Sequence, residues 1–146
     1  MTPGLSQDAA DLAEDARRLL VELDREVPGA ASLTAECRPP LDVLETSTAL
    51  EIVVDVPGVA ANSLRIAIRR STLLVVGAKV APGTDPERRY HVAERSYGRF
   101  ARAIRLTGAI DATQARATTS AGELRVVLPR LVDRRGTVLL IPVEAT

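Results

Sequence analysis

Aliphatic residues in the middle of this chain recur at every second position, and this alternation is what most constrains the fold. Leu50, Ile52 and Val54 follow it, and the same pattern returns at Ile66 and Ile68. A period of two places such side chains on one face of a β-strand. Turn residues separate these segments at a spacing of roughly ten residues, without intervening helices, so we predict an all-β fold, an immunoglobulin-like antiparallel β-sandwich. The predicted strands cover residues 50–56, 64–69, 72–76, 90–96, 100–106, 114–119 and 123–128.

A helical periodicity precedes the strands. Apolar residues recur there at steps of three and four, which predicts an amphipathic helix over residues 7–27. The stripe comprises Leu12, Ala16, Leu19, Leu20, Leu23 and Val27. We expect Ser6 to cap the start of this helix and Pro28-Gly29 to end it. The chain therefore divides into a helical arm with a linker, a sandwich and a short extended tail, over residues 1–38, 39–130 and 131–146.

Composition and charge exclude several classes of protein. With 46% apolar and 26% charged residues, the chain of 146 residues is expected to fold. A single cysteine and a single histidine, Cys37 and His91, cannot form a disulfide within the chain or a zinc site of three or four N/S ligands. The acidic amino terminus does not look like a signal peptide, and no apolar run is long enough to span a membrane. We therefore expect a cytoplasmic protein.

No motif for catalysis is present. The sequence contains no G-x-S-x-G elbow, no phosphate-binding G-x-x-x-x-G-K-[ST] and no G-x-G-x-x-G. His91 is interpreted as a surface or interface residue rather than a general base. Cys37 lies next to Arg38, which could lower its pKa mildly, but an incidental thiol is the favoured interpretation. We expect no enzyme, no cofactor and no metal.

Charge is distributed unevenly along the chain. Residues 1–37 hold eight acidic and three basic side chains, a net −5, which leaves eleven acidic and sixteen basic, a net +5, in residues 38–146. The two regions should attract each other weakly. Six arginines and all three aromatic residues, Tyr90, Tyr97 and Phe100, lie between Arg88 and Arg105.

Rings beside guanidinium groups are typical of surfaces that bind single-stranded nucleic acid. The alternative is that these arginines lie across a subunit interface and meet acids such as those of the helix. We favour the interface because the rest of the predicted domain has no extended basic surface. A nucleic-acid-binding β domain stays the rival interpretation.

The apolar segment 137–143 near the end of the chain contains Pro142, which lacks the N–H that a central strand needs. It is therefore an edge strand or an extended segment lying on a surface. Ile141 and Val143, two residues apart, point the same way. They could cover the open edge of a neighbouring molecule or form the last strand of their own sheet.

Several motifs, in order, resemble the small heat-shock proteins of the α-crystallin type, over about Arg38 to Val143. Asp55-Val56-Pro57-Gly58-Val59 resembles the family's D-L-P-G-V turn, and residues 94–100 resemble its E-R-x-x-G-x-F segment. Residues 117–129 match the spacing of A-x-x-x-x-G-x-L-x-V-x-x-P, with Ala121 where asparagine is common. Ile141-Pro142-Val143 looks like the I/V-x-I/V motif of the family's tail, which favours an anchor to another subunit.

The resemblance implies an ATP-independent holdase that binds unfolding client proteins and prevents their aggregation, working as an oligomer of dimers. The dimer would form when residues 90–96, held on a long loop, pair with residues 41–46 of the partner. The implied dimer interface comprises Leu41, Val43, Tyr90, His91, Val92, Glu94, Arg95 and Arg102.

Ile141 and Val143 would anchor in a groove of a neighbouring dimer. The implied groove residues are Leu64, Ile66, Ile68, Ala115 and Ala117. Because residues 1–37 contain no aromatic residue, client binding is expected on the leucine stripe, at Leu12, Leu19, Leu20 and Leu23. The expected partners are clients and further copies of this chain, with no membrane. A dedicated co-chaperone or structural component on the same fold is the remaining alternative.

Overall fold

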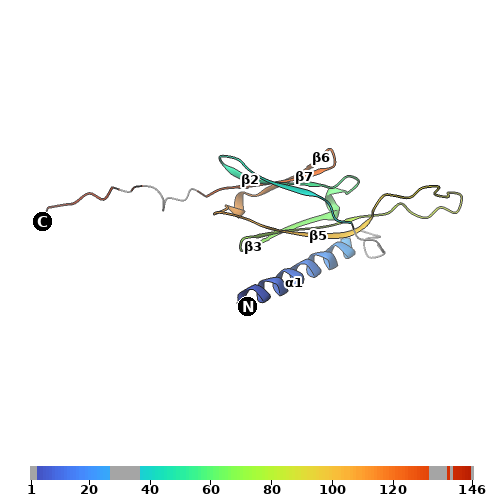
Figure 1. Ribbon diagram of the computed structural model, residues 1–146, viewed down its shortest axis with the longest axis horizontal. Helices are drawn as coiled ribbons and strands as arrows, with labels where there is room; N and C mark the ends of the chain where they lie inside the picture. Colours follow the sequence, from blue (N-terminus) through green and yellow to red (C-terminus); the bar gives the residue numbers. More distant parts are fainter. Residues whose placement is uncertain (1–2, 27–36, 132–137, 139, 146) are drawn as a thin grey trace.

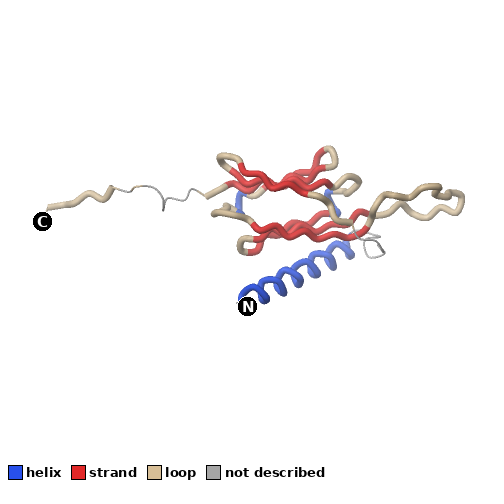
Figure 2. The backbone as a smooth tube through the Cα atoms, in the orientation of Figure 1, coloured by secondary structure: helices blue, strands red, loops and turns tan. Residues whose placement is uncertain are grey.

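The structure is a computed structural model that describes residues 3–26, 37–131, 138 and 140–145. Figure 1 and Figure 2 show two sheets packed face to face, with a helix against the outside of one of them. The elements are α1 (Pro3–Glu26), β1 (Leu41–Glu45), β2 (Ala49–Asp55), β3 (Leu64–Arg69), β4 (Thr72–Lys79), β5 (Gly98–Arg105), β6 (Arg116–Ser120) and β7 (Glu123–Pro129). Short 3-10 turns occupy Ala61–Ser63 and Ala112–Gln114.

The two sheets are antiparallel and have the strand orders β1-β2-β7-β6 and β3-β4-β5. In the central pair of the larger sheet, Ile52 of β2 lies opposite Val126 of β7. Both strands alternate between buried and more exposed positions, as their period of two predicts. The predicted antiparallel β-sandwich is therefore confirmed.

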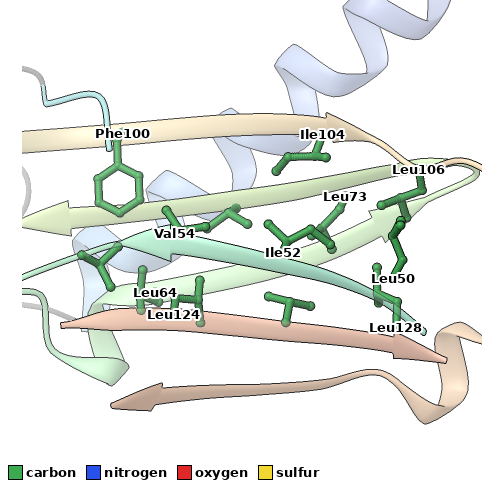
Figure 3. Close-up of a cluster of buried hydrophobic side chains, with 13 residues drawn as sticks. Leu50, Ile52, Val54, Leu64, Leu73, Phe100, Ile104, Leu106, Leu124 and Leu128 are labelled. Atoms are coloured by element: carbon green, nitrogen blue, oxygen red, sulfur yellow. The ribbon is translucent and has the colours of Figure 1, made fainter. Parts of the chain in front are cut away.

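An almost wholly aliphatic core fills the space between the sheets (Figure 3). Ile52, Leu73 and Leu128 are completely buried. The core contains one aromatic ring, Phe100 of β5, which lies opposite Gly77 of β4. A Cβ atom at Gly77 would collide with Phe100 and Leu64, so the glycine provides the space in which the ring packs.

Strand β4 differs from the other strands because it is buried on both faces. Leu73 and Val75 point into the core, whereas Leu74, Val76 and Ala78 form a separate cluster on the outer face of the sheet. Three side chains of α1 pack on that cluster: Ala16, Leu19 and Leu20. Burying Leu74 and Val76 stabilises the folded chain by about 3–6 kcal/mol. The helix is therefore packed on the sandwich as an additional layer.

Ion pairs reinforce this packing. Arg69, the last residue of β3, places Nη1 2.8 Å from Asp15 Oδ2 and Nη2 4.0 Å from Asp11 Oδ2. The two aspartates are four residues apart and so lie on one side of α1. The expected attraction between the acidic arm and the basic sandwich is thus visible as specific contacts.

Two details of the predicted elements are wrong. The helix begins at Pro3, so Ser6 lies inside it and does not cap it; proline is favoured in a first turn, where its missing N–H is not needed. Residues 90–96 form no strand but belong to a loop, 80–97, between β4 and β5. The predicted helix end at Pro28-Gly29 and most of the linker lie outside the described residues.

The tail runs away from the sandwich (Figure 1), and its described residues belong to no strand. Val138, Leu140, Ile141 and Val143 are all at least 85% exposed. The sequence left two possibilities open for this segment, a contact with a neighbouring molecule or a last strand of the chain's own sheet. The described residues of the tail do not form such a strand.

The β6–β7 hairpin turns through Ala121 and Gly122, which have φ angles of +52° and +76°. Two consecutive positive φ angles define the tight turn for which Asn-Gly is the preferred pair. Alanine is strained at the first position because its Cβ approaches the following carbonyl oxygen in the left-handed region.

We predict that Ala121→Asn raises the free energy of unfolding by about 0.5–1 kcal/mol, since asparagine tolerates the left-handed conformation better than alanine. Urea denaturation measures the change. Ala81→Asn is the matched control, because Ala81 is also exposed in a loop but its φ is not positive. An equal gain in both variants, or none at Ala121, would contradict the account of strain.

Candidate functional site

The sandwich has two open sides, each formed by the edge strands of both sheets. On one side lie β1 and β5, and on the other lie β3 and β6. An edge strand carries backbone N–H and C=O groups without a ladder partner, so another chain can add to it. The candidate interaction sites lie on these two sides and on the segments that project from the sandwich.

The side between β3 and β6 carries a groove of about 410 Å³. Four of the five predicted groove residues line it: Ile66, Ile68, Ala115 and Ala117. The fifth, Leu64, is 8% exposed and belongs to the core. Leu73 and Val126, which the sequence did not point to, also line this groove. The resulting lining is mostly aliphatic and suits small branched side chains.

The side between β1 and β5 is rich in arginine. Arg102 of β5 donates a hydrogen bond from Nη1 to the carbonyl oxygen of Pro39, at 2.7 Å, and so connects β5 to the segment that enters β1. Arg17, Arg38, Arg99 and Arg102 line a cleft of about 670 Å³ between α1 and β5. Leu41 and Val43 lie on β1, where Val43 is 45% exposed.

The remaining predicted interface residues lie on the 80–97 loop, which projects beyond the sandwich (Figure 2). These residues are Tyr90, His91, Val92, Glu94 and Arg95, and all five are exposed. Tyr90 and Val92 are more than 70% exposed despite their apolar surface. Strand β1 pairs with β2 only in the described part of the chain, so the chain does not bring these loop residues onto its own β1.

The aromatic residues do not form a common stacking surface. Phe100 is buried in the core. The Tyr97 ring is approached by Arg95 at 5.2 Å and by Lys79 at 5.7 Å, distances typical of cation–π contacts. Tyr90 is 71% exposed on the loop. The three rings that suggested nucleic-acid binding therefore lie in three different places: in the core, in cation–π contacts with Arg95 and Lys79, and on the loop.

The predicted client-binding stripe is only partly open to solvent. Leu19 and Leu20 are half-buried against β4, and the side chains of Leu12 and Leu23 lie outside the described residues. Val21 is 51% exposed on the same helix and was not predicted. The outer apolar face of β4 was also missed, although the unbroken apolar run Leu73–Ala78 was a signal for burial on two faces.

Cys37 is less acidic than its neighbour Arg38 suggested. Its Sγ donates to the carbonyl oxygen of Gly98 at 3.4 Å, and it packs against the core. Burial raises the pKa of the Cys37 thiol, and the positive charge of Lys79 opposes that rise without cancelling it. The mild lowering of the pKa that Arg38 could have caused is not found, because desolvation of the thiolate outweighs the nearby charges.

At neutral pH, Cys37 should react with iodoacetamide several times more slowly than an exposed thiol, because less of it is thiolate and access is restricted. The rate should keep rising as the pH increases beyond 9. Mass spectrometry of the alkylated chain measures it. A plateau already below pH 8.5 would indicate a lowered pKa.

Within the described residues, no group of three His, Cys, Asp or Glu side chains is placed to hold a metal ion. A search of the same residues found no helix of the length and apolarity needed to cross a membrane.

Comparison with known proteins decides the family. The profile of the Hsp20/alpha crystallin family matches residues 42–144, which is most of the chain. The chain belongs to this family. The sandwich described above is accordingly an α-crystallin domain, and the resemblance of the motifs is confirmed.

Two curated members of the family come from Rickettsia felis. Small heat shock protein C2 is 28% identical over 103 residues, which cover 70% of this chain and 67% of that protein. Small heat shock protein C4 is 28% identical over 92 residues, covering 63% and 56%. The match thus spans little more than half the length of the second relative.

A solved structure of the family, heat shock protein 16.0 from Schizosaccharomyces pombe, is also similar. It is 29% identical, covers 75% of this chain and 100% of that chain, and superposes with a TM-score of 0.64. The family consists of small heat-shock proteins, which act as chaperones.

Proposed function

We propose that this chain is an ATP-independent holdase, which binds unfolding proteins and prevents their aggregation, and that it works in the cytoplasm as an oligomer of dimers. One observation carries the proposal: an α-crystallin sandwich presents a projecting loop, an exposed tail and an aliphatic groove. In the described part of the chain, the tail residues are exposed rather than seated in the groove, and β1 pairs with β2 rather than with the loop. Apolar side chains exposed in this way are suited to contacts between chains.

The proposed dimer pairs the 80–97 loop with β1 of the partner. Two features support it. First, β1 is an edge strand whose Val43 and Leu44 are 45% and 38% exposed, so both its edge and its apolar surface are accessible. Second, the loop supplies Tyr90 and Val92 together with two charged residues, Glu94 and Arg95. The strand-like character of residues 90–96 would then be expressed between chains, because a strand needs a partner for its hydrogen bonds.

Arg102 supports the same dimer. Its hydrogen bond to the Pro39 carbonyl holds the chain just ahead of β1, where the partner's loop would arrive. It would act by positioning the entry to β1.

The proposed link between dimers places Ile141 and Val143 in the β3–β6 groove of a neighbour. The two side chains are 85% and 96% exposed, and they point the same way in an extended segment. Burying both stabilises the contact by about 3–6 kcal/mol before ordering costs. Such a contact would be reversible, which suits a protein that has to release apolar surface when clients unfold.

The holdase is tested by light scattering from citrate synthase heated without ATP. We expect suppression of aggregation at a near-stoichiometric ratio of subunits, since each subunit would bind clients through its own surface. Lysozyme, a folded protein of similar size, is the control for nonspecific protection. Scattering that is unchanged by this chain would contradict the holdase and leave a dedicated co-chaperone or structural role on the same fold.

The tail anchor is tested by the double variant Ile141→Ser/Val143→Ser in size-exclusion chromatography with light scattering. We expect the assembly to fall to dimers, because serine cannot replace the buried aliphatic contact. The matched control is Val138→Ser/Leu140→Ser, which removes two aliphatic side chains of similar exposure, 88% and 91%, from the same segment. Equal effects of the two double variants would contradict the assignment to Ile141 and Val143.

A further inference from the structure

The outer face of β4 is unusual for the surface of a sandwich. Leu74, Val76 and Ala78 are at most 4% exposed there, although they point away from the core between the sheets. They are buried because α1 covers them. Without the helix, a continuous aliphatic strip in the middle of the three-stranded sheet would face solvent.

The cover is a single helix. Among the side chains that the structure describes, Ala16, Leu19 and Leu20 make its apolar contacts with this face, and ion pairs join Asp11 and Asp15 to Arg69. Arg69 and Asp15 have side chains 46% and 17% exposed, so water and salt weaken their attraction. Figure 1 shows α1 lying along the outside of the sheet, with the strands of the sheet on one side of it only. Removing the helix would therefore leave the core between the two sheets in place.

We propose that the outer face of β4, made of Leu74, Val76 and Ala78, is a binding surface for aliphatic segments of unfolding clients, which α1 of the same chain keeps closed. The inference rests on the proposed holdase and names where clients bind.

The side chains that α1 places on this face indicate which kind of client segment would bind there. The helix presents an aliphatic stripe without aromatic rings, flanked by carboxylates that reach Arg69. A client segment that is aliphatic and carries an acidic residue offers the same chemistry. Undocking of α1 would also expose Leu19 and Leu20. Both the outer face of β4 and the apolar side of α1 would then be available to clients.

The test uses two cysteine variants of the full-length chain in a Cys37→Ser background. Val76→Cys and Val75→Cys change adjacent residues of β4, both completely buried, on opposite faces of the strand. Labelling by N-ethylmaleimide at the temperature of the aggregation assay then separates undocking of α1 from opening of the core. We expect Val76→Cys to react at least about tenfold faster than Val75→Cys, and heat-unfolded citrate synthase to remove most of its labelling.

A charge reversal tests the role of the ion pair. Arg69→Asp in the Val76→Cys chain should raise the labelling rate up to about fivefold, as the loss of a partly exposed pair allows. The control is Arg125→Asp, which removes a pair of matching length and exposure on the other sheet, Arg125 with Glu51 at 3.0 Å. It should leave the labelling rate unchanged.

Four results would overturn the proposal. Equal rates for the two cysteines would mean that α1 does not undock separately from the core. Equal acceleration by Arg69→Asp and Arg125→Asp would mean that no specific pair holds α1. Labelling that is slowed by excess wild-type chain rather than by citrate synthase would assign the face to a neighbour's helix. Labelling that is fast but insensitive to citrate synthase would place client binding elsewhere.

In the last case the unsubstituted chain would still suppress aggregation, so the holdase would stand while this inference fails. If the unsubstituted chain suppresses no aggregation, the proposed function fails and this inference fails with it.

Discussion

Burial of β4 on both faces is the constraint on which much of this structure depends. Leu73 and Val75 form part of the core between the sheets, while Leu74 and Val76 require a cover on the outside. A β-sandwich of two layers cannot provide that cover, since each sheet has one face toward solvent. The amphipathic helix provides it, so the arm and the sandwich form three layers rather than a domain with a free extension.

The same sandwich leaves its two sides open, and they differ in chemistry. The β3–β6 side is a small aliphatic groove, whereas the β1–β5 side is bordered by arginines and by an edge strand. The segments that project from the sandwich differ in a corresponding way: the anchor of the tail is aliphatic, whereas the loop carries rings and charges. This correspondence supports separate contacts for the dimer and for the larger assembly, as proposed above.

Short-range sequence patterns correctly predicted the strands that pair with another strand of the same chain. The alternation at Leu50, Ile52 and Val54 identified β2 and its buried face, because a period of two is visible without any knowledge of the partner strand. Residues 90–96 resemble a strand equally well but form a loop here. A strand is stabilised by hydrogen bonds to a neighbour, and no neighbour within the described chain pairs with this one. The direction of the pKa shift of Cys37 could not be read from the sequence for a related reason, because sequence shows the adjacent Arg38 but not the burial that raises the pKa.

By itself, the sequence determined the sandwich, the amphipathic helix and the motifs of the family, because these depend on periodicity and spacing along the chain. The resemblance to the family added four of the residues that line the groove. Only the tertiary structure decided that α1 lies on β4, that Arg69 meets Asp15, and that Arg102 holds the entry to β1. Those contacts join residues more than fifty positions apart. Which of several similar apolar faces and charges meet across such a separation depends on how the layers pack in three dimensions.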